Sequence, residues 1–135
     1  MPSSGGANDV APFSQRLMPT IIIANQANGT LINKLDFLTS PGYLDGPGAR
    51  ERIGLPNSTG PYRAITQLGI YGFDEETKRL RLMSLHPGVN VEQVKENSSF
   101  DISIPDKVET SPEPTEEDLR ILREEIDPVG IVSVR

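Results

Sequence analysis

The hydrophobic and polar positions along the chain predict a series of short β-strands. Residues 20–24 (TIIIA) form a continuously apolar, mostly β-branched run, which is typical of a strand covered on both faces, as parallel strands are. We expect this strand to be central in its sheet. Further strands are predicted at residues 31–39, 62–73, 79–85 and 100–104. The polar segment 74–78 between two of them indicates a hairpin.

Capping residues predict short helices beside these strands. Asn8 or Asp9 could cap a first short helix near the start of the chain. Asn90 and Gln93 have the spacing of a capping box, in which side-chain and backbone groups satisfy one another, at the start of a helix over residues 91–97.

The last part of the chain predicts a linker and a final helix. Residues 105–114 (PDKVETSPEP) have the composition of an exposed linker. Thr115 and Asp118 form a second capping-box pattern, and the helix that follows would end before Pro128. This helix would place three apolar residues on one face: Leu119, Leu122 and Ile126.

Residues 40–61 are rich in Pro and Gly and predict a long loop, interrupted by one short turn near residues 49–52. A loop of this length inside a compact domain usually has a function. The basic residues Arg50 and Arg52 could contact a phosphate group there. The alternative is that they form surface ion pairs with the neighbouring acidic residues Asp45 and Glu51.

Composition narrows the class of protein. The 135 residues fit one domain, and 12 Pro and 12 Gly with 36% hydrophobic residues favour a loop-rich α/β or β-rich fold over a helical bundle. The net charge of −6 and the pI near 4.8 argue against a nucleic-acid partner, because phosphate backbones bind basic surfaces.

The chain contains no cysteine, which excludes thiolate nucleophiles, disulfides and cysteine-bound zinc. The start of the chain does not resemble a basic and apolar leader, and the longest apolar run, residues 21–24, is far too short to cross a membrane. We therefore expect a cytoplasmic protein without a membrane partner.

Few side chains suggest chemistry directly. His86 is the sole histidine and could act as an acid or base, or it could be a turn residue whose ring caps a strand end. Pairs of adjacent acidic residues could bind metal or transfer protons, or they could be solvated surface: Glu75 and Glu76, Glu116 and Glu117, and Glu124 and Glu125. Composition and spacing give no complete catalytic set.

The segment 3–9 (SSGGAND) contains a glycine turn near the start of the chain. Backbone N–H groups at Gly5 and Gly6 could stabilise a developing oxyanion, such as that of an attacked thioester. One such donor contributes roughly 3 kcal/mol of transition-state stabilisation. The alternative is that two glycines near a chain terminus are simply flexible.

Several segments taken in order resemble the β subunit of class I coenzyme A transferases, particularly the glutaconate type and its hydrolase relatives in steroid ring degradation. These segments are SSGGANDVA, DFLTSPGYLDGPGARE, YRAITQLGIYGFDEETKRLRLMSLHPGVNVEQVKENSSFD and TEEDLRILREEIDP. The resemblance covers nearly the whole chain but only about the second half of such a β subunit. The glycine turn would then lie in the middle of a larger domain.

The resemblance implies an α/β fold, with part of an open, largely parallel sheet of the CoA-transferase type, a β-hairpin and a C-terminal helix. Residues 1–104 would form the C-terminal half of the α/β domain, 105–114 a linker, and 115–135 the C-terminal helix and tail. The resemblance assigns the substrate oxyanion site to Ser4, Gly5, Gly6, Ala7 and Asn8, which match the family's glycine loop.

The family's mechanism implies that this sequence lacks the nucleophilic glutamate. In these enzymes a glutamate attacks an acyl-CoA, which gives a mixed anhydride and then a glutamyl-CoA thioester, and a second acid collects the CoA. That glutamate lies in the half without a counterpart here, so no catalytic residue is assigned and the chain is expected to be inactive alone. CoA would be a substrate, with no permanently bound cofactor.

The implied partners are acyl-CoA, an α subunit, and a further chain that supplies the first half of the β subunit. The complete enzyme would transfer CoA between carboxylic acids. Alternatives are part of a ring-opening CoA hydrolase, or a non-catalytic remnant or assembly module. Half a sheet cannot cover the apolar residues 21–23, so we expect the chain to oligomerise or to require a partner.

Overall fold

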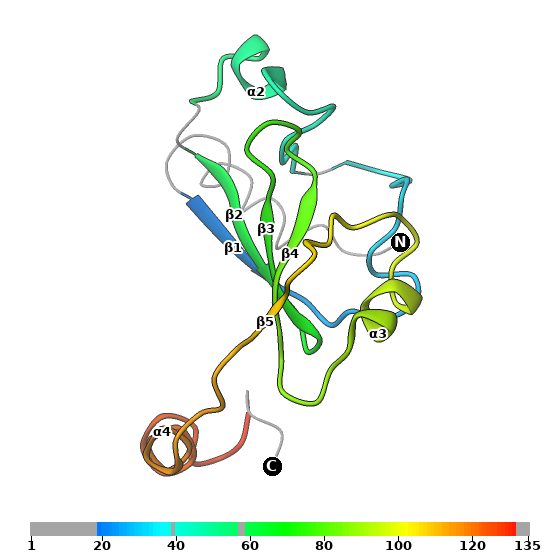
Figure 1. Cartoon of the computed structure of the whole chain (residues 1–135). Coiled ribbons are helices and arrows are strands. Elements are labelled where there is room, and N and C mark those ends of the chain that lie inside the picture. The colour runs from blue at the N-terminus through cyan, green and yellow to red at the C-terminus, as the bar shows by residue number, and fades with distance from the viewer. Residues whose placement is uncertain (1–18, 39, 57–58, 132–135) are drawn as a thin grey trace.

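The computed structural model describes residues 19–38, 40–56 and 59–131. Its centre is a five-stranded sheet in the order β1-β2-β3-β4-β5 (Figure 1). The strands are β1 (Pro19–Ile23), β2 (Gly60–Ile65), β3 (Gly69–Phe73), β4 (Leu80–Leu85) and β5 (Glu109–Thr110). The pairs β1–β2 and β4–β5 are parallel, whereas β2–β3 and β3–β4 are antiparallel. The prediction of a largely parallel sheet is therefore wrong, because tight turns join the middle strands and such turns connect antiparallel neighbours.

The strand predictions are confirmed in part. The apolar run does form β1, but β1 is at the edge of the described sheet and not at its centre. The region 62–73 contains two strands instead of one, because the Thr66 hydroxyl accepts the N–H groups of Leu68 (3.1 Å) and Gly69 (3.3 Å) and closes a turn between them. The hairpin formed by β3 and β4 is confirmed.

Two predicted strands do not form within the described residues. Residues 31–38 form bends, and the Leu31 carbonyl accepts hydrogen bonds from a loop residue, Ser99, at its N (3.0 Å) and its Oγ (2.7 Å). Residues 100–104 make only an isolated bridge to β4, at Ser103. Alternation of apolar and polar residues does not by itself supply a neighbouring strand to pair with.

The helices are short: α2 (Ala49–Arg52), α3 (Val91–Glu96), α4 (Glu116–Arg120) and the π-helix η1 (Ile121–Ile126). Both predicted capping boxes are present, at Asn90 with Gln93 and at Thr115 with Asp118. The first predicted helix lies outside the described residues. None of the helices in the described ranges has the length and apolar character that crossing a bilayer requires.

The expected linker 105–114 contains β5, which extends the sheet beside β4. The Ser111 amide also donates to the Leu85 carbonyl at 2.8 Å. This part of the segment is therefore attached to the sheet, and the connection that leaves the sheet begins after it. The division of the chain into domains at 105 and 115 stays a prediction.

The hydrophobic core lies on one face of the sheet, between β3, β4 and α3. Tyr71, Leu82 and Val94 are fully buried there, and Leu68 and Leu85 complete the cluster. Half-buried side chains from residues 102–108 cover its margin. The short helix α3 therefore contributes one central core residue, while the others come from β3, β4 and the turn before β3.

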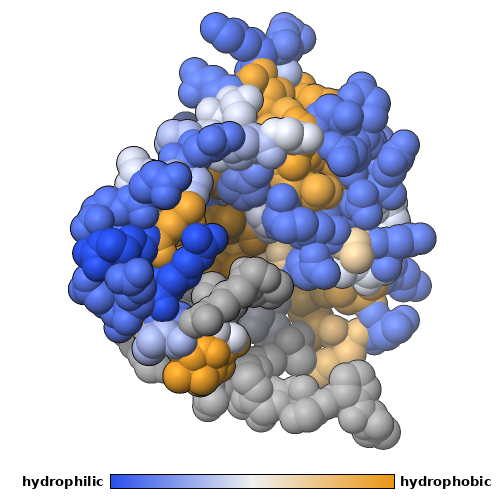
Figure 2. All heavy atoms as spheres, turned by 90° about the horizontal axis from the view of Figure 1, so that it is seen from below, coloured by the Kyte–Doolittle hydropathy of each residue, from blue (hydrophilic) through white to orange (hydrophobic). Residues whose placement is uncertain are grey.

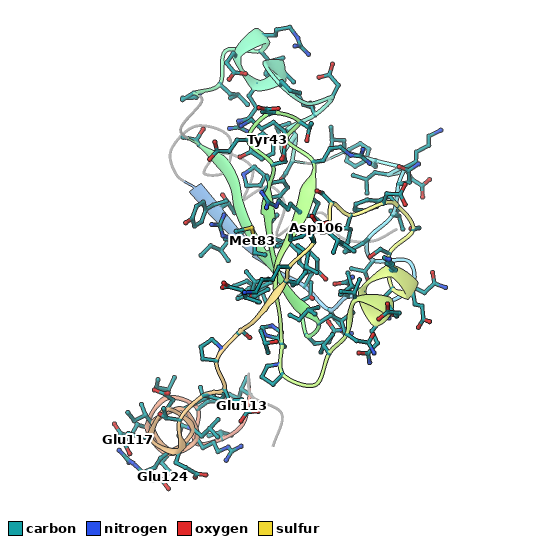
Figure 3. The ribbon with its side chains drawn as sticks, in the orientation of Figure 1. Tyr43, Met83, Asp106, Glu113, Glu117 and Glu124 are labelled. Carbon is teal, nitrogen blue, oxygen red and sulfur yellow. The ribbon has the colours of Figure 1, made fainter. Side chains whose placement is uncertain are left out.

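The β1 side of the sheet is much less covered. Ile21, Ile22 and Ile23 are 56%, 43% and 81% exposed. Met83 is also exposed, and it lies on the side of the sheet away from α3 (Figure 3). Figure 2 shows apolar surface remaining open among hydrophilic residues when the molecule is seen from below. The expectation that this apolar strand lacks a complete cover is therefore confirmed for the described part of the chain.

Gln26 closely follows β1 and is the centre of a buried polar network. The network joins the loop after β1 to the turn after β2, to β3 and to the C-terminal end of α3. The backbone N–H of Gln26 donates to Gln67 Oε1 (2.7 Å), and Gln67 Nε2 donates back to the Gln26 carbonyl (2.6 Å). The buried Gln26 side chain accepts from Tyr71 OH (2.6 Å) and from the Thr66 hydroxyl (3.0 Å). Its amide nitrogen donates to Ser98 Oγ (3.0 Å) and, less closely, to the Val94 carbonyl (3.3 Å). We call these contacts the Gln26 network.

Every polar group of Gln26 thus has a partner, which is what permits a polar side chain to be buried. Burial raises the pKa of Tyr71 above its usual value, and the hydrogen bonds to Thr66 and Gln26 oppose that rise. The Tyr71 phenol therefore remains a neutral donor to Gln26. The loop after β1 is held by hydrogen bonds to β3, α3 and the turn after β2.

Replacing Gln26 with leucine should destabilise the chain strongly. Gln26→Leu leaves the buried Tyr71 hydroxyl without its acceptor and leaves the Thr66 hydroxyl only its longer bond to the Gly69 carbonyl (3.4 Å), so we expect the free energy of unfolding to fall by about 3 kcal/mol. Urea unfolding monitored by circular dichroism measures this. The control is Asn25→Leu at the exposed neighbouring position, for which we expect a change within about 0.5 kcal/mol. Equal losses in the two variants would contradict the role of the network.

The variant Gln26→Glu should be destabilised in a pH-dependent way. A carboxylate cannot donate to Ser98 or Val94, and burial raises the pKa of a carboxyl group in the folded state. The deficit relative to wild type should be small below about pH 4.3, where the group is protonated in both states, and should grow as the pH rises towards the raised folded-state pKa. Unfolding measured from about pH 4 to about pH 8 tests this, and a deficit that is constant with pH would contradict it.

Candidate functional site

The predicted oxyanion residues Ser4, Gly5, Gly6, Ala7 and Asn8 lie outside the described residues. Their role therefore stays a prediction from the sequence. The described part of the chain does show which edge of the sheet is suited to hold a ligand.

The carboxyl ends of the parallel strands β1 and β2 lie side by side. In open α/β sheets, ligands bind outside such ends. Here the Ala24 amide donates to the Ile65 carbonyl at 3.0 Å, and the reciprocal pair between Gln26 and Gln67 fixes the two loops that follow. Asn25 is exposed beside this pair. We call this region, residues 24–28 and 66–68, the carboxyl edge.

Sequence reasoning missed Gln26 and Gln67 as organising residues. The available signal was the position of Gln26, a polar residue that closely follows an apolar run and precedes the Asn28–Gly29 turn. A buried polar side chain needs partners, but those partners are distant in sequence, at separations of 40 to 72 residues. The pattern around Gln26 therefore could not identify them.

His86 links the carboxyl edge to the segment after β5. Its Nε2 lies 2.9 Å from the Thr66 carbonyl, and its Nδ1 lies 2.9 Å from Ser111 Oγ. A carbonyl only accepts, so the network assigns the hydrogen to Nε2 in the neutral ring, and Nδ1 then accepts from the Ser111 hydroxyl. Both ring nitrogens are thus engaged in joining two segments, which supports the interpretation of His86 as a residue that caps a strand end.

The acidic pairs lie on the surface. Glu75 and Glu76 are in the turn where Asp74 accepts hydrogen bonds from Thr77, and these bonds lower the pKa of Asp74. In the C-terminal helix, Arg120 pairs with Glu117, Glu124 and Glu125 at 2.9, 3.4 and 3.0 Å. Within the described ranges, no three side chains that bind metals lie close enough to share an ion.

The two loop arginines differ in their surroundings. Arg52 makes a surface ion pair with Asp45, in which Nη2 contacts both carboxylate oxygens, at 2.8 and 2.9 Å, as one of the two alternatives predicted. Arg50 is buried, and it donates to the Gly42 carbonyl (2.7 Å) and to Thr59 Oγ1 (2.9 Å). Arg50 thus holds the loop against itself, and neither guanidinium is oriented by the structure toward a phosphate site.

The same loop borders an open, mainly apolar groove of about 820 Å³. Tyr43 lines it: its hydroxyl donates to the Pro61 carbonyl (2.7 Å) and its ring meets that of Phe73 edge to face, with centroids 5.1 Å apart. Burial raises the pKa of Tyr43, and the charge of Arg50 opposes this. Tyr43 lies near the end of the sheet that carries α2 (Figure 3).

This groove lies at the opposite end of the parallel strands from the carboxyl edge, because Pro61 is near the start of β2. Its lining is mainly apolar and includes the polar side chains of Ser40, Tyr43, Asp45 and Lys78. Because ligands in open α/β sheets bind outside the carboxyl ends of the strands, the carboxyl edge is the better candidate for a catalytic contact. The described residues do not assemble a complete catalytic set there.

Comparison with known proteins identifies the family. The family model described as coenzyme A transferase matches residues 1–97. The chain is 44% identical over 126 residues to the β subunit of glutaconate CoA-transferase from Acidaminococcus fermentans, covering 93% of this chain and 45% of that protein. It is 37% identical over 123 residues to the β subunit of 3-oxoadipate CoA-transferase from Pseudomonas knackmussii, covering 91% and 46%.

A third relative is the cholesterol ring-cleaving hydrolase IpdB subunit of Rhodococcus jostii, which is 39% identical over 67 residues and covers 50% of this chain and 26% of that one. The chain thus spans less than half the length of these curated relatives. The sequence segments quoted above likewise resembled only about the second half of a β subunit, so the two observations agree.

Solved structures agree with this assignment. Glutaconate coenzyme A-transferase from Acidaminococcus fermentans superposes with a TM-score of 0.86 at 40% identity, over 100% of this chain and 50% of that one. IpdAB of Rhodococcus jostii superposes with a TM-score of 0.72 at 28% identity, over 90% and 48%. The resemblance carried by the sequence motifs is confirmed, and the chain belongs to the β-subunit family of class I coenzyme A transferases.

Proposed function

We propose that this chain is part of an enzyme that transfers CoA between carboxylic acids, and that it contributes the glycine turn at residues 4–8 to the acyl-CoA thioester site. The observation that carries this proposal is the extent of the likeness. The β subunits of two CoA-transferases are 44% and 37% identical over more than nine-tenths of the chain, whereas the hydrolase subunits are 39% identical over only half of it or 28% identical over 81% of it.

In this enzyme the chain provides stabilisation and positioning. The nucleophilic glutamate of the family comes from the part of the β subunit that has no counterpart here. When it attacks the thioester carbonyl, negative charge develops on the carbonyl oxygen, and N–H groups of the turn donate to that oxygen. CoA leaves as the thiolate and later attacks the anhydride carbonyl, which gives the glutamyl-CoA thioester and releases the acyl group as a carboxylate.

The chain requires partners for this activity. We infer an α subunit, because the relatives are named as one subunit of a larger enzyme and the solved Rhodococcus relative is the pair IpdAB. We also infer a segment that adds a strand beside β1. The edge of the described sheet at β1 offers backbone groups for such pairing, and its isoleucines remain 43% to 81% exposed.

A second candidate function is part of a ring-opening CoA hydrolase. The 39% identity to the IpdB subunit of Rhodococcus jostii favours it within the shared 67 residues. A third is a non-catalytic remnant or assembly module, which would retain the sheet and its edge without chemistry. The three candidates differ in what co-purifies with the chain and in what the purified complex does to an acyl-CoA.

The native complex should contain more than this chain. We expect gentle purification from the source, followed by native mass spectrometry, to yield a complex that contains this sequence, an α subunit and the first half of the β subunit, the last on the same or on another polypeptide. The complex should convert a mixture of acyl-CoA and a free carboxylate into the exchanged pair, as measured by mass spectrometry of the CoA esters.

Other results would identify the alternatives. Release of free CoA or cleavage of a carbon ring would indicate the hydrolase. A chain that purifies alone, as a dilute monomer, would refute the multi-chain enzyme and favour the remnant.

The glycine turn can be tested separately within the active complex. Gly6→Pro removes one N–H donor, so we expect kcat to fall about 100-fold with little change in KM. Gly6→Ala is the matched control because it retains the N–H while also losing the freedom of glycine. Equal activities of the two variants would show that the N–H of residue 6 does not act on the oxyanion.

A further inference from the structure

His86 and Ser111 form a pair of side chains for which the proposed function has no role. His86 lies in the turn after β4, and Ser111 directly follows β5, which pairs with the end of β4 (Figure 1). Ser111 Oγ is 2.9 Å from His86 Nδ1. A hydroxyl at hydrogen-bond distance from an imidazole nitrogen has the geometry that proton transfer to a general base requires.

The Thr66 carbonyl determines which nitrogen of His86 can accept that proton. It lies 2.9 Å from Nε2 and can only accept a hydrogen bond, so the hydrogen of the neutral ring is on Nε2. Nδ1 therefore directs its lone pair at Ser111 Oγ. Thr66 is buried, and its hydroxyl donates to Gln26 Oε1 at 3.0 Å, so the Gln26 network holds the group that orients the ring. This order of hydroxyl, imidazole and fixed acceptor is that of a nucleophile with an oriented base.

The backbone also fixes the position of the Ser111 hydroxyl. The Ser111 amide donates to the Leu85 carbonyl at 2.8 Å, and the preceding residue, Thr110, is paired with Leu85 in the sheet. Pro112 follows, and a proline restricts the backbone of the residue before it. Nucleophile and base are thus held in register by the sheet, which lowers the entropic cost of bringing them together.

The pair is accessible from solution in the described part of the chain. His86 and Ser111 are half-buried, and Pro87, Gly88 and Pro112 beside them are exposed. A Cβ added at Gly88 would meet no atom within 4 Å other than those of its chain neighbours, so open space borders the turn after His86. We therefore expect a small electrophile to reach Ser111 Oγ without local unfolding.

The group that orients His86 is a carbonyl and not a carboxylate. A carbonyl holds the ring and its tautomer, but it stabilises less strongly the imidazolium that forms when Nδ1 takes the proton. We therefore expect His86 to accelerate the reaction of Ser111 by about 100-fold, the lower end of the usual range for general acid–base assistance.

We propose that Ser111 is an acyl acceptor for acyl thioesters of the CoA class and that His86 is its general base. Ser111 Oγ attacks the thioester carbonyl and the C–S bond breaks, which leaves the acyl group as an ester on Ser111. The Oγ proton passes to His86 Nδ1 and then to the sulfur of the departing CoA, so the second product is the CoA thiol. The choice of acyl-CoA as the donor rests on the proposed function, whereas the pairing of nucleophile and base does not.

The test measures acetylation of Ser111 in the native complex that contains this sequence. p-Nitrophenyl acetate is an activated ester that requires no CoA site, and acetyl-CoA is the thioester donor. Peptide mass spectrometry of quenched samples gives the rate at each serine. With both donors we expect Ser111 to be acetylated about 100-fold faster than Ser99. Ser99 is the internal comparison because its hydroxyl is exposed but donates to the Leu31 carbonyl at 2.7 Å instead of to an imidazole.

The variant His86→Gln separates proton transfer from the structural contacts of the ring. Its amide retains a donor for the Thr66 carbonyl and an acceptor for the Ser111 hydroxyl, but it cannot take up the proton. We expect acetylation of Ser111 to fall about 100-fold, to the rate at Ser99, while native mass spectrometry shows an intact complex. Ser99→Ala is the matched control and should leave acetylation of Ser111 unchanged.

Chemical rescue provides a second measurement that a purely structural role would not affect. In His86→Ala, added imidazole should restore acetylation of Ser111 and should not raise the rate at Ser99 to the same extent, because a free imidazole can occupy the space that the ring leaves beside Ser111. Equal rates at Ser111 in wild type and in His86→Gln would refute the role of His86.

The two donors distinguish this inference from the proposed function. Acetylation of Ser111 by p-nitrophenyl acetate but not by acetyl-CoA would refute acyl thioesters as the donors, and with them the proposal. A complex that acetylates Ser111 from acetyl-CoA but does not exchange CoA between carboxylic acids would support this inference and contradict the proposed function. A complex that exchanges CoA while Ser111 reacts no faster than Ser99 would leave the proposed function intact and overturn this inference.

Discussion

The buried side chain of Gln26 holds the poorly covered β1 side of the sheet in place. The hydrophobic core lies around β3, β4 and α3, and the isoleucines of β1 have little cover. Contacts from Gln26 to Gln67, Tyr71 and Ser98 connect the end of β1 to that core. Because each donor and acceptor of Gln26 is satisfied, its burial is tolerated, and the carboxyl edge is ordered by hydrogen bonds more than by apolar packing.

The same set of contacts reaches the segment that follows β5. Thr66 bonds to Gln26 through its hydroxyl and to His86 through its carbonyl, and His86 in turn contacts Ser111. Ser111 is also bonded to the end of β4 through its amide. The point at which residues 112–131 leave the sheet is therefore fixed relative to the carboxyl edge.

Local and long-range interactions explain which features the sequence could predict. The capping boxes at Asn90 and Thr115 depend on residues three positions apart, and both are predicted correctly. The order of strands and the partners of Gln26 depend on residues far apart in the chain, so the sequence misplaces β1 and does not reveal the network. The glycine turn is assigned from family resemblance, because two glycines alone do not distinguish an oxyanion site from a flexible terminus.

The edge of β1 determines what kind of partner the described sheet accepts. It presents backbone groups, so a partner strand can pair with it under weak constraints on side-chain identity. The isoleucines of β1 are 43% to 81% exposed, so such a strand would also cover apolar surface. Because the Gln26 network already fixes the loop after β1, a strand can be added at this edge without rearranging the core around β3, β4 and α3.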